Sequence, residues 1–391
     1  MVEPTQKRAS KIGRTLALFF DGTWNDTGDN TNVWRLKSLC ADFDALGRPQ
    51  LTYYDRGVNG FWGGSFGIGL TDNVKFGYEW LVENYRAGDD IFIFGFSRGA
   101  YTARCLAGFV AKQGLLVRGA PLGVGQVYDR YKRPGCDTIY TLAERMAAEK
   151  PDDFSIEDRW MLKYSQKVSI KMVGVWDTVG ALGLPVFHIP GFSSSTLSFL
   201  HTGLRQSILN AYHAVAIDEH RGKFAPTLWT KLSTTEAAPR SLEAVEQRWF
   251  VGAHANVGGG YFSDPLSQPS LRWMILKAQK LGLFLTGEII PDKIDGFKVA
   301  DSYGKFLKGA YSRISPPYFR PIDADPKSTD KPNETERSIN ETIDASVFER
   351  CRQDTSYKPN NLVEWAQRKN VDLPSLNDSV LASKPAILVV D

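Results

Sequence analysis

The sequence predicts an α/β protein with a mostly parallel central sheet and helices on both faces. Short, continuous apolar runs alternate along the chain with segments whose apolar residues recur at helical spacing. This alternation is typical of parallel strands joined by crossover helices. Wholly apolar runs such as residues 91–94 indicate strands that are covered on both faces. With 391 residues, of which 42% are hydrophobic, the chain can bury a large core without disulfides or metals.

The expected elements follow in order from this alternation. Apolar, β-prone runs predict strands, and apolar residues at helical spacing predict helices. Asp72 is expected to cap the helix that ends near residue 86. Strands are expected over residues 15–20, 51–54, 91–94, 168–176 and 247–251, and helices over 30–40, 72–86, 100–112, 204–217 and 266–281.

The same pattern predicts one principal domain. Residues 15–322 are expected to form it, with a flexible N-terminus over residues 1–14. Two insertions, a helical one at about 120–166 and an apolar, loop-like one at 181–200, are expected to form a cap. Residues 323–391 are expected to begin with a polar loop, reaching about residue 345, and to continue as an extension packed on the same domain.

Charge and cysteine content exclude several classes of protein. The net charge is only +3, so nucleic acid is not an expected partner. The four cysteines are scattered and form no CxxC pair, which argues against a zinc ribbon or a redox motif. Residues 1–14 lack the apolar core of a secretory signal, and no run of about 18 apolar residues occurs. We therefore expect a cytoplasmic protein, or one exported without a signal peptide.

The most informative motif is Gly95-Phe96-Ser97-Arg98-Gly99, which matches G-x-S-x-G. It follows a predicted strand and precedes a predicted helix, which is the context that a nucleophilic serine on a sharp turn requires. Gly95 and Gly99 are expected to let the strand and helix approach each other. The turn would raise the Ser97 hydroxyl to the carboxyl end of the sheet, at the positive N-terminus of the helix.

A serine hydroxyl needs a base, and the base needs a carboxylate that orients it. His254 is the predicted base because it follows a strand and is flanked by glycines, unlike the other four histidines, His188, His201, His213 and His220. Asp177 is the predicted orienting residue because it ends a strand between Ser97 and His254. Asp218 and Glu219 are its rivals, although they follow a predicted helix.

Two backbone amides are expected to stabilise the oxyanion that forms during attack. One belongs to Arg98, directly after the nucleophile, and the other to Gly22 or Thr23 after the first strand. Asp21 is expected to brace this turn by accepting backbone hydrogen bonds. Asp21, Asp177 and His254 are a weaker alternative as a metal site, because their spacing is not that of metal ligands. No metal or cofactor is expected.

Several further segments are informative when taken together and in order. They are residues 19–25, 54–58, 95–104, 174–180, 216–221 and 254–261. These segments resemble the bacterial and fungal α/β-hydrolase domain family that includes the first family of type VI secretion lipase effectors, which are phospholipases. The resemblance implies an α/β-hydrolase-like fold and a Ser97–Asp177–His254 triad. At Asn256 the family often carries an aspartate, and an amide can still form hydrogen bonds there.

The resemblance and the residues together predict a serine hydrolase that cleaves a phospholipid or another lipid acyl ester through an acyl-enzyme, with peripheral contact to a membrane. Apolar segments near the strand ends are expected to bind the acyl chain, with Phe61, Trp62, Leu184 and Phe187 as candidates. Two alternatives remain open. The protein is an esterase for a small soluble or polymeric ester, or it is a non-catalytic binding module with a hydrolase-like fold.

Overall fold

The computed structural model describes residues 13–22, 30–57, 66–148, 154–179, 204–230, 239–262, 264–287, 297–324 and 337–389. In these residues a nine-stranded sheet runs in the order β11-β10-β9-β8-β7-β6-β3-β1-β2. From β2 to β9 in this order all pairs of strands are parallel, whereas β10 pairs in antiparallel fashion with both β9 and β11. This mostly parallel sheet confirms the predicted α/β-hydrolase-like fold.

The strands of this sheet are short and mostly buried. Their bounds are β1 Thr15–Phe20, β2 Gln50–Asp55, β3 Asp90–Phe96, β6 Met172–Trp176, β7 Ala211–Ala216, β8 Val245–Phe250, β9 Glu341–Ile343, β10 Ser379–Leu381 and β11 Lys384–Val389. A second, two-stranded sheet pairs β4 (Leu115–Leu116) with β5 (Ser165–Gln166).

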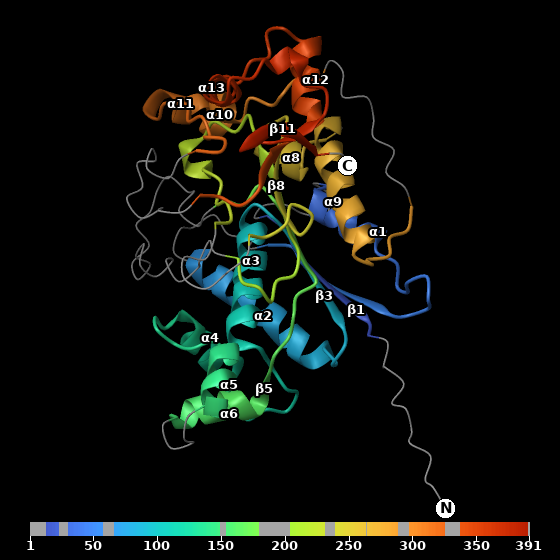
Figure 1. Ribbon diagram of the computed structural model, residues 1–391, viewed down its shortest axis with the longest axis vertical. Helices are drawn as coiled ribbons and strands as arrows, with labels where there is room; N and C mark the ends of the chain where they lie inside the picture. The colour runs from blue at the N-terminus through green and yellow to red at the C-terminus, as the bar shows by residue number, and fades with distance from the viewer. Residues whose placement is uncertain are drawn as a thin grey trace, which may run out of the picture.

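Helices cover both faces of the large sheet (Figure 1). Helices α2 (Phe66–Asn84) and α3 (Arg98–Gln113) pack on one face. Helices α1 (Asn32–Leu39) and α9 (Gln268–Lys280) pack on the other. Alternate residues of β1 divide between these cores, so that Leu18 faces α2 and α3 whereas Phe19 faces α1 and α9. This division explains why β1 is apolar without interruption from Leu16 to Phe20.

The C-terminal part of the chain extends the same sheet. Helices α12 (Ala345–Gln353) and α13 (Asn360–Lys369) build a third cluster with Val215 of β7 and Trp249 of β8. Ahead of these helices lie α10 (Ser302–Lys305) and α11 (Ala310–Ile314). Residues after 337 therefore supply three strands and two covering helices.

The helical insertion packs on the outer side of α2 and α3. It consists of α4 (Val124–Lys132), α5 (Ile139–Ala148) and α6 (Ile156–Tyr164). Tyr128 and Tyr131 of α4 contact Phe109 of α3. This contact lies along the C-terminal half of α3, whereas Ser97 precedes its first residue. The second predicted insertion, 181–200, lies outside the described residues.

Three predictions about the elements were wrong. The segment 204–217, which was expected to be a helix, contains strand β7. The strand was not predicted because all six of its residues are buried and its alanines break the alternation of polar and apolar residues that indicates a strand. The helix assigned to Asp72 begins earlier, at Phe66, and Asp72 instead forms an exposed ion pair with Lys75 at 3.7 Å. The segment expected to be a polar loop contains β9. This strand was not predicted because Glu341 and Thr342 are polar although they are buried.

Within the described ranges, no helix combines the length and the apolarity needed to cross a bilayer.

Candidate active site

The turn between β3 and α3 presents Ser97 at the carboxyl end of the sheet. Ser97 adopts φ 57° and ψ −119°, a positive φ that serine rarely adopts. Its backbone N–H donates to the carbonyl of Trp176 at 3.0 Å, which ties the turn to β6. Space is short on both sides of the turn. A Cβ on Gly95 would lie 2.4 Å from the Gly99 carbonyl oxygen, and one on Gly99 would lie 2.1 Å from that of Phe20.

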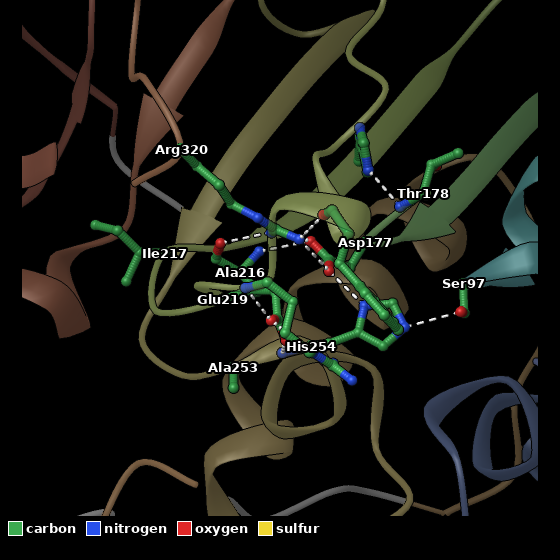
Figure 2. A network of polar contacts seen from close by, with 12 residues as sticks. Ser97, Asp177, Thr178, Ala216, Ile217, Glu219, Ala253, His254 and Arg320 are labelled. Carbon is green, nitrogen blue, oxygen red and sulfur yellow. Dashed lines mark hydrogen bonds and ion pairs between the residues drawn. The ribbon is translucent and has the colours of Figure 1, made fainter. Parts of the chain in front are cut away.

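His254 begins the short helix α8 (His254–Gly258), and a turn of three residues separates it from the end of β8. Its Nε2 lies 2.8 Å from Ser97 Oγ, and its Nδ1 lies 2.5 Å from Asp177 Oδ2. Figure 2 shows the imidazole between the hydroxyl and the carboxylate. The rings of Phe96 and Phe224 contact the imidazole, with centroids 4.8 and 5.2 Å away. Three segments separated by more than 70 residues thus meet at one edge of the sheet.

Asp177 follows β6 directly and is completely buried. Its Oδ1 accepts a hydrogen bond from the backbone N–H of Ala216 at 2.9 Å, while Oδ2 faces His254. Asp177 itself has a positive φ of 37°. This conformation and the Ala216 contact hold the carboxylate in one orientation towards the imidazole.

Arg320 is a member of the site that no sequence motif marks. It is completely buried, and it contacts both oxygens of Asp177, with Nη1 2.6 Å from Oδ1 and Nη2 3.0 Å from Oδ2 (Figure 2). Its guanidinium also donates to the carbonyls of Ala216 at 2.7 Å and Phe224 at 2.6 Å. Arg320 lies 143 residues after Asp177 in a segment without a recognisable pattern, so only folding reveals the pair.

The charge of Arg320 decides the ionisation of Asp177. Burial by itself would raise the pKa of the Asp177 carboxyl. The charge of Arg320 and the hydrogen bond and charge of His254 outweigh burial, so the pKa lies well below its usual value. Asp177 is therefore a carboxylate at neutral pH, as an orienting residue must be.

The rivals of Asp177 brace the loop that carries His254. Asp218 accepts a hydrogen bond from the Gly252 N–H at 2.7 Å and one from the Tyr357 hydroxyl at 2.8 Å. Glu219 accepts the His254 N–H at 3.3 Å and pairs with Arg221 at 2.7 Å. Both carboxylates follow strand β7 and not the predicted helix. Their hydrogen bonds go to backbone amides and neighbouring side chains, whereas Nδ1 of the His254 imidazole contacts Asp177.

The turn after β1 is tied down by Asp21. One carboxylate oxygen of Asp21 accepts the Gly22 N–H at 2.7 Å, and the other accepts hydroxyl hydrogen bonds from Thr31 at 2.5 Å and Tyr54 at 2.9 Å. The Gly22 amide thus already has a partner, which makes it a poor oxyanion donor. The alternative donor, Thr23, lies outside the described residues. Arg98 is the first residue of α3.

The remaining predicted residues divide into two groups. Asn256 accepts the N–H groups of Ala253 at 3.1 Å and Ala300 at 3.0 Å, and it donates to Asp264 at 2.8 Å. It therefore fixes the α8 turn and does not contact the triad. The four candidates for acyl-chain contacts, Phe61, Trp62, Leu184 and Phe187, lie outside the described residues. Among the described side chains, no cluster of His, Cys, Asp and Glu could hold a metal ion.

A sheet of this topology, with serine, aspartate and histidine in this chain order at its carboxyl edge, defines a hydrolase of the lipase and esterase class. A sequence profile described as the catalytic domain of Tle1-like phospholipase effectors of the type VI secretion system matches residues 14–277. This match covers more than half of the chain, so the chain belongs to that family. The resemblance predicted from the motifs is confirmed.

The individual proteins that match this chain have low sequence identity to it. An uncharacterized protein of Saccharomyces cerevisiae is 27% identical over 248 residues, which are 57% of this chain and 34% of the yeast protein. The structure of an uncharacterized protein from Pseudomonas aeruginosa aligns with a TM-score of 0.42 and 18% identity, over 74% of this chain and 49% of that one. The structure of the Tle1 effector bound to the VgrG spike aligns with a TM-score of 0.33 and 18% identity, over 65% of this chain and 53% of that one. The matches thus span about a third to a half of these relatives' lengths.

Proposed function

We propose that the protein hydrolyses an acyl ester of a phospholipid through an acyl-enzyme on Ser97. The observation that carries the proposal is the pair of contacts of His254, 2.8 Å to Ser97 Oγ and 2.5 Å to Asp177 Oδ2. Membership in a family of phospholipase effectors favours a phospholipid as the substrate.

The first half of the reaction forms the acyl-enzyme. His254 Nε2 takes the proton of Ser97 Oγ as the oxygen attacks the ester carbonyl. The carbonyl oxygen becomes an oxyanion, which the Arg98 amide at the N-terminus of α3 can stabilise, with Thr23 as the second candidate donor. The tetrahedral intermediate collapses when the C–O bond of the ester breaks and His254 returns the proton to the departing lysolipid oxygen.

The second half repeats these steps with water. His254 takes a proton from water, the hydroxide oxygen attacks the acyl carbon, and the ester bond to Ser97 breaks as its oxygen regains the proton. Free fatty acid leaves. Asp177 stays ionised throughout and stabilises the imidazolium that exists at each transition state.

The test is fatty-acid release from phosphatidylcholine or phosphatidylethanolamine vesicles by the wild type and by Ser97→Ala. We expect the substitution to lower turnover by roughly a millionfold, because the triad acts as a unit. The proposal fails if the purified wild type releases no fatty acid in excess of Ser97→Ala.

Two further measurements separate the alternatives. An esterase for small soluble or polymeric esters would prefer short-chain aryl esters to long-chain lipids. A non-catalytic binding module would not react with a fluorophosphonate probe, whereas an activated Ser97 would be labelled and Ser97→Ala would not.

A further inference from the structure

A small cavity that contains two arginine side chains lies beside α3, on the face of the sheet that α2 and α3 cover. Tyr101 and Arg104 of α3, Tyr131 of α4, Arg205 and Trp229 are among the residues that line it. Its volume is about 40 Å³. Because one ordered water needs roughly 10–15 Å³ by the same measure, the cavity has room for about three waters or one small tetrahedral anion.

The walls of this cavity carry positive charge without a matching negative charge. None of the ten lining residues is acidic. The Arg104 guanidinium lies 4.7 Å from the centroid of the Trp229 ring and donates to the carbonyl of Thr227. Within the described part of the chain, neither Arg104 nor Arg205 forms an ion pair. Both side chains are partly buried, and a cation that is removed from water in part without a counter-charge favours an anion beside it.

The pKa values of the groups in and beside the cavity agree with an excess of positive charge. Burial lowers the pKa of Arg104 to about 10, and no carboxylate offsets that effect. Burial also lowers the pKa of Lys112, and the charge of Arg205 lowers it further. Burial raises the pKa of the Tyr101 and Tyr131 hydroxyls, so both remain protonated and able to donate to an anion.

The cavity is connected to the triad through two short segments. Tyr101 follows Ser97 by one helical turn, and its N–H donates to the Ser97 carbonyl at 3.3 Å. Arg104 is seven residues from Ser97, about 10 Å along the helix axis at roughly 1.5 Å per residue. On the opposite wall, the N–H of Thr227 donates at 2.9 Å to the carbonyl of Thr178, the neighbour of Asp177.

These distances suit a phosphate-bearing ester. The phosphate of a phospholipid lies a few bonds from its acyl carbonyls, a reach comparable with the roughly 10 Å of helix that separates Arg104 from Ser97. We propose that this cavity binds the phosphate group of the substrate, so that Arg104 and Arg205 select a phosphate-bearing ester over a neutral one. The inference rests on the proposed function, because the ester is cleaved at Ser97.

The test compares two lipids with the same acyl chains, phosphatidylcholine and diacylglycerol, in neutral detergent micelles. Arg205→Gln is the main variant, because the partly exposed Arg205 side chain makes no described hydrogen bond whose loss would unfold the protein. Arg118→Gln is the matched control, since it removes the same charge from an exposed position outside the cavity.

We expect Arg205→Gln to lower kcat/KM for phosphatidylcholine by about tenfold or more, because a charge-assisted contact to phosphate is lost. Its kcat/KM for diacylglycerol should stay within about twofold of the wild-type value, because diacylglycerol has no phosphate group for Arg205 to contact. Arg205→Lys should restore part of the loss, and Arg118→Gln should change neither substrate. Equal losses on both lipids, or no loss on either, would overturn the proposal.

A second arm identifies the source of the phosphate. Inorganic phosphate is titrated calorimetrically into Ser97→Ala with and without Arg205→Gln. If Arg205→Gln abolishes phosphate binding while the ratio of phosphatidylcholine to diacylglycerol hydrolysis is unchanged, the cavity serves a free phosphate and the substrate assignment is overturned. If the wild type cleaves neither lipid, the proposed function fails, and Arg205-dependent phosphate binding still supports the anion site by itself.

Discussion

At the scale of single residues, the site depends on conformations that cost free energy. Ser97 and Asp177 both have positive φ angles, 57° and 37°. Such a conformation costs a non-glycine residue on the order of 1–3 kcal/mol and persists only when the surroundings impose it. Here the Ser97 N–H is held by Trp176 and the Asp177 N–H by Ala214. Each turn is thus held by the neighbouring strand of the sheet, that of Ser97 by β6 and that of Asp177 by β7.

Arg320 provides a prediction at this scale. Arg320→Gln removes the charge that holds the pKa of Asp177 down, so the acid limb of the kcat/KM profile should move to higher pH. We expect kcat to fall by roughly 10- to 100-fold at neutral pH, the loss of a charged hydrogen bond. Arg320→Lys keeps the charge but not the two-point contact and should recover part of both effects. An unchanged pH profile, accompanied only by a lower Tm, would show that Arg320 is merely structural.

Glu219 provides a second residue-scale prediction, on stability. Burial would raise its pKa, but the hydrogen bond and charge of Arg221 lower it from 4.5 to about 2. A lowered folded-state pKa stabilises the fold fully above the unfolded value and loses this effect as pH falls through the folded value. The shift corresponds to roughly 3 kcal/mol.

Glu219→Gln should therefore lower the free energy of unfolding by roughly 3 kcal/mol at neutral pH, and the difference from the wild type should shrink as pH falls from 4.5 towards 2. Urea titrations at pH 7 and pH 3 would measure this. A difference that does not depend on pH would contradict the assignment of the stabilisation to the Glu219 charge.

At the scale of elements, the close approach of α3 to β1 shapes the nucleophile turn. A Cβ at Gly99 would lie 2.1 Å from the Phe20 carbonyl oxygen and 2.4 Å from that of Asp21. Both atoms belong to the backbone, so neither can rotate away. The spacing between strand and helix therefore requires glycine at this position.

Gly99→Ala should separate α3 from β1 and destabilise the protein by several kcal/mol, more than the usual 1–3 kcal/mol of overpacking, because backbone must move. Gly125→Ala is the matched control, since a Cβ there meets nothing within 4 Å in helix α4. The control should leave the protein unchanged or stabilise it by about 0.5–1 kcal/mol. Thermal unfolding of both variants measures the difference, and equal Tm values would contradict the packing argument.

The elements also show why sequence patterns succeed or fail. β3 and α3 were predicted correctly because an apolar run, a turn and an amphipathic helix follow one another with local signals. β7 was mistaken for a helix because burial on both faces removes the alternation that distinguishes a strand. β9 was missed because its polar residues are paired inside the fold, where Glu341 accepts the Trp249 indole N–H at 2.8 Å. Trp249 lies 92 residues before Glu341, so this hydrogen bond leaves no local signal in the sequence.

At the scale of the whole molecule, the family match ends at residue 277, but the sheet does not. β9 pairs with β8, and α12 and α13 cover Val215 and Trp249. Arg320 also comes from beyond the matched residues. The region matched by the profile therefore lacks one edge of its sheet and one charge of its active site.

Truncation after residue 287 should consequently yield little soluble protein, because it uncovers the β8 edge and a set of core aromatics. Soluble yield, thermal unfolding and fluorophosphonate labelling would measure the effect. Deletion of residues 1–12 is the control, since they precede the predicted domain at residues 15–322 and lie outside the described residues. A truncated chain that is soluble and labelled like the full chain would refute this role of the C-terminal strands.

Local signals in the sequence predict the fold class and nominate Ser97, Asp177 and His254, because each residue stands near the end of a strand. Two contacts could not be predicted before the chain was folded: the choice of the carboxylate that faces the imidazole, and the ion pair of Arg320 with Asp177. The difference lies in the range of the interactions. Turn geometry and periodicity depend on neighbouring residues, whereas a contact across 143 residues exists only after the sheet and its covering helices have packed.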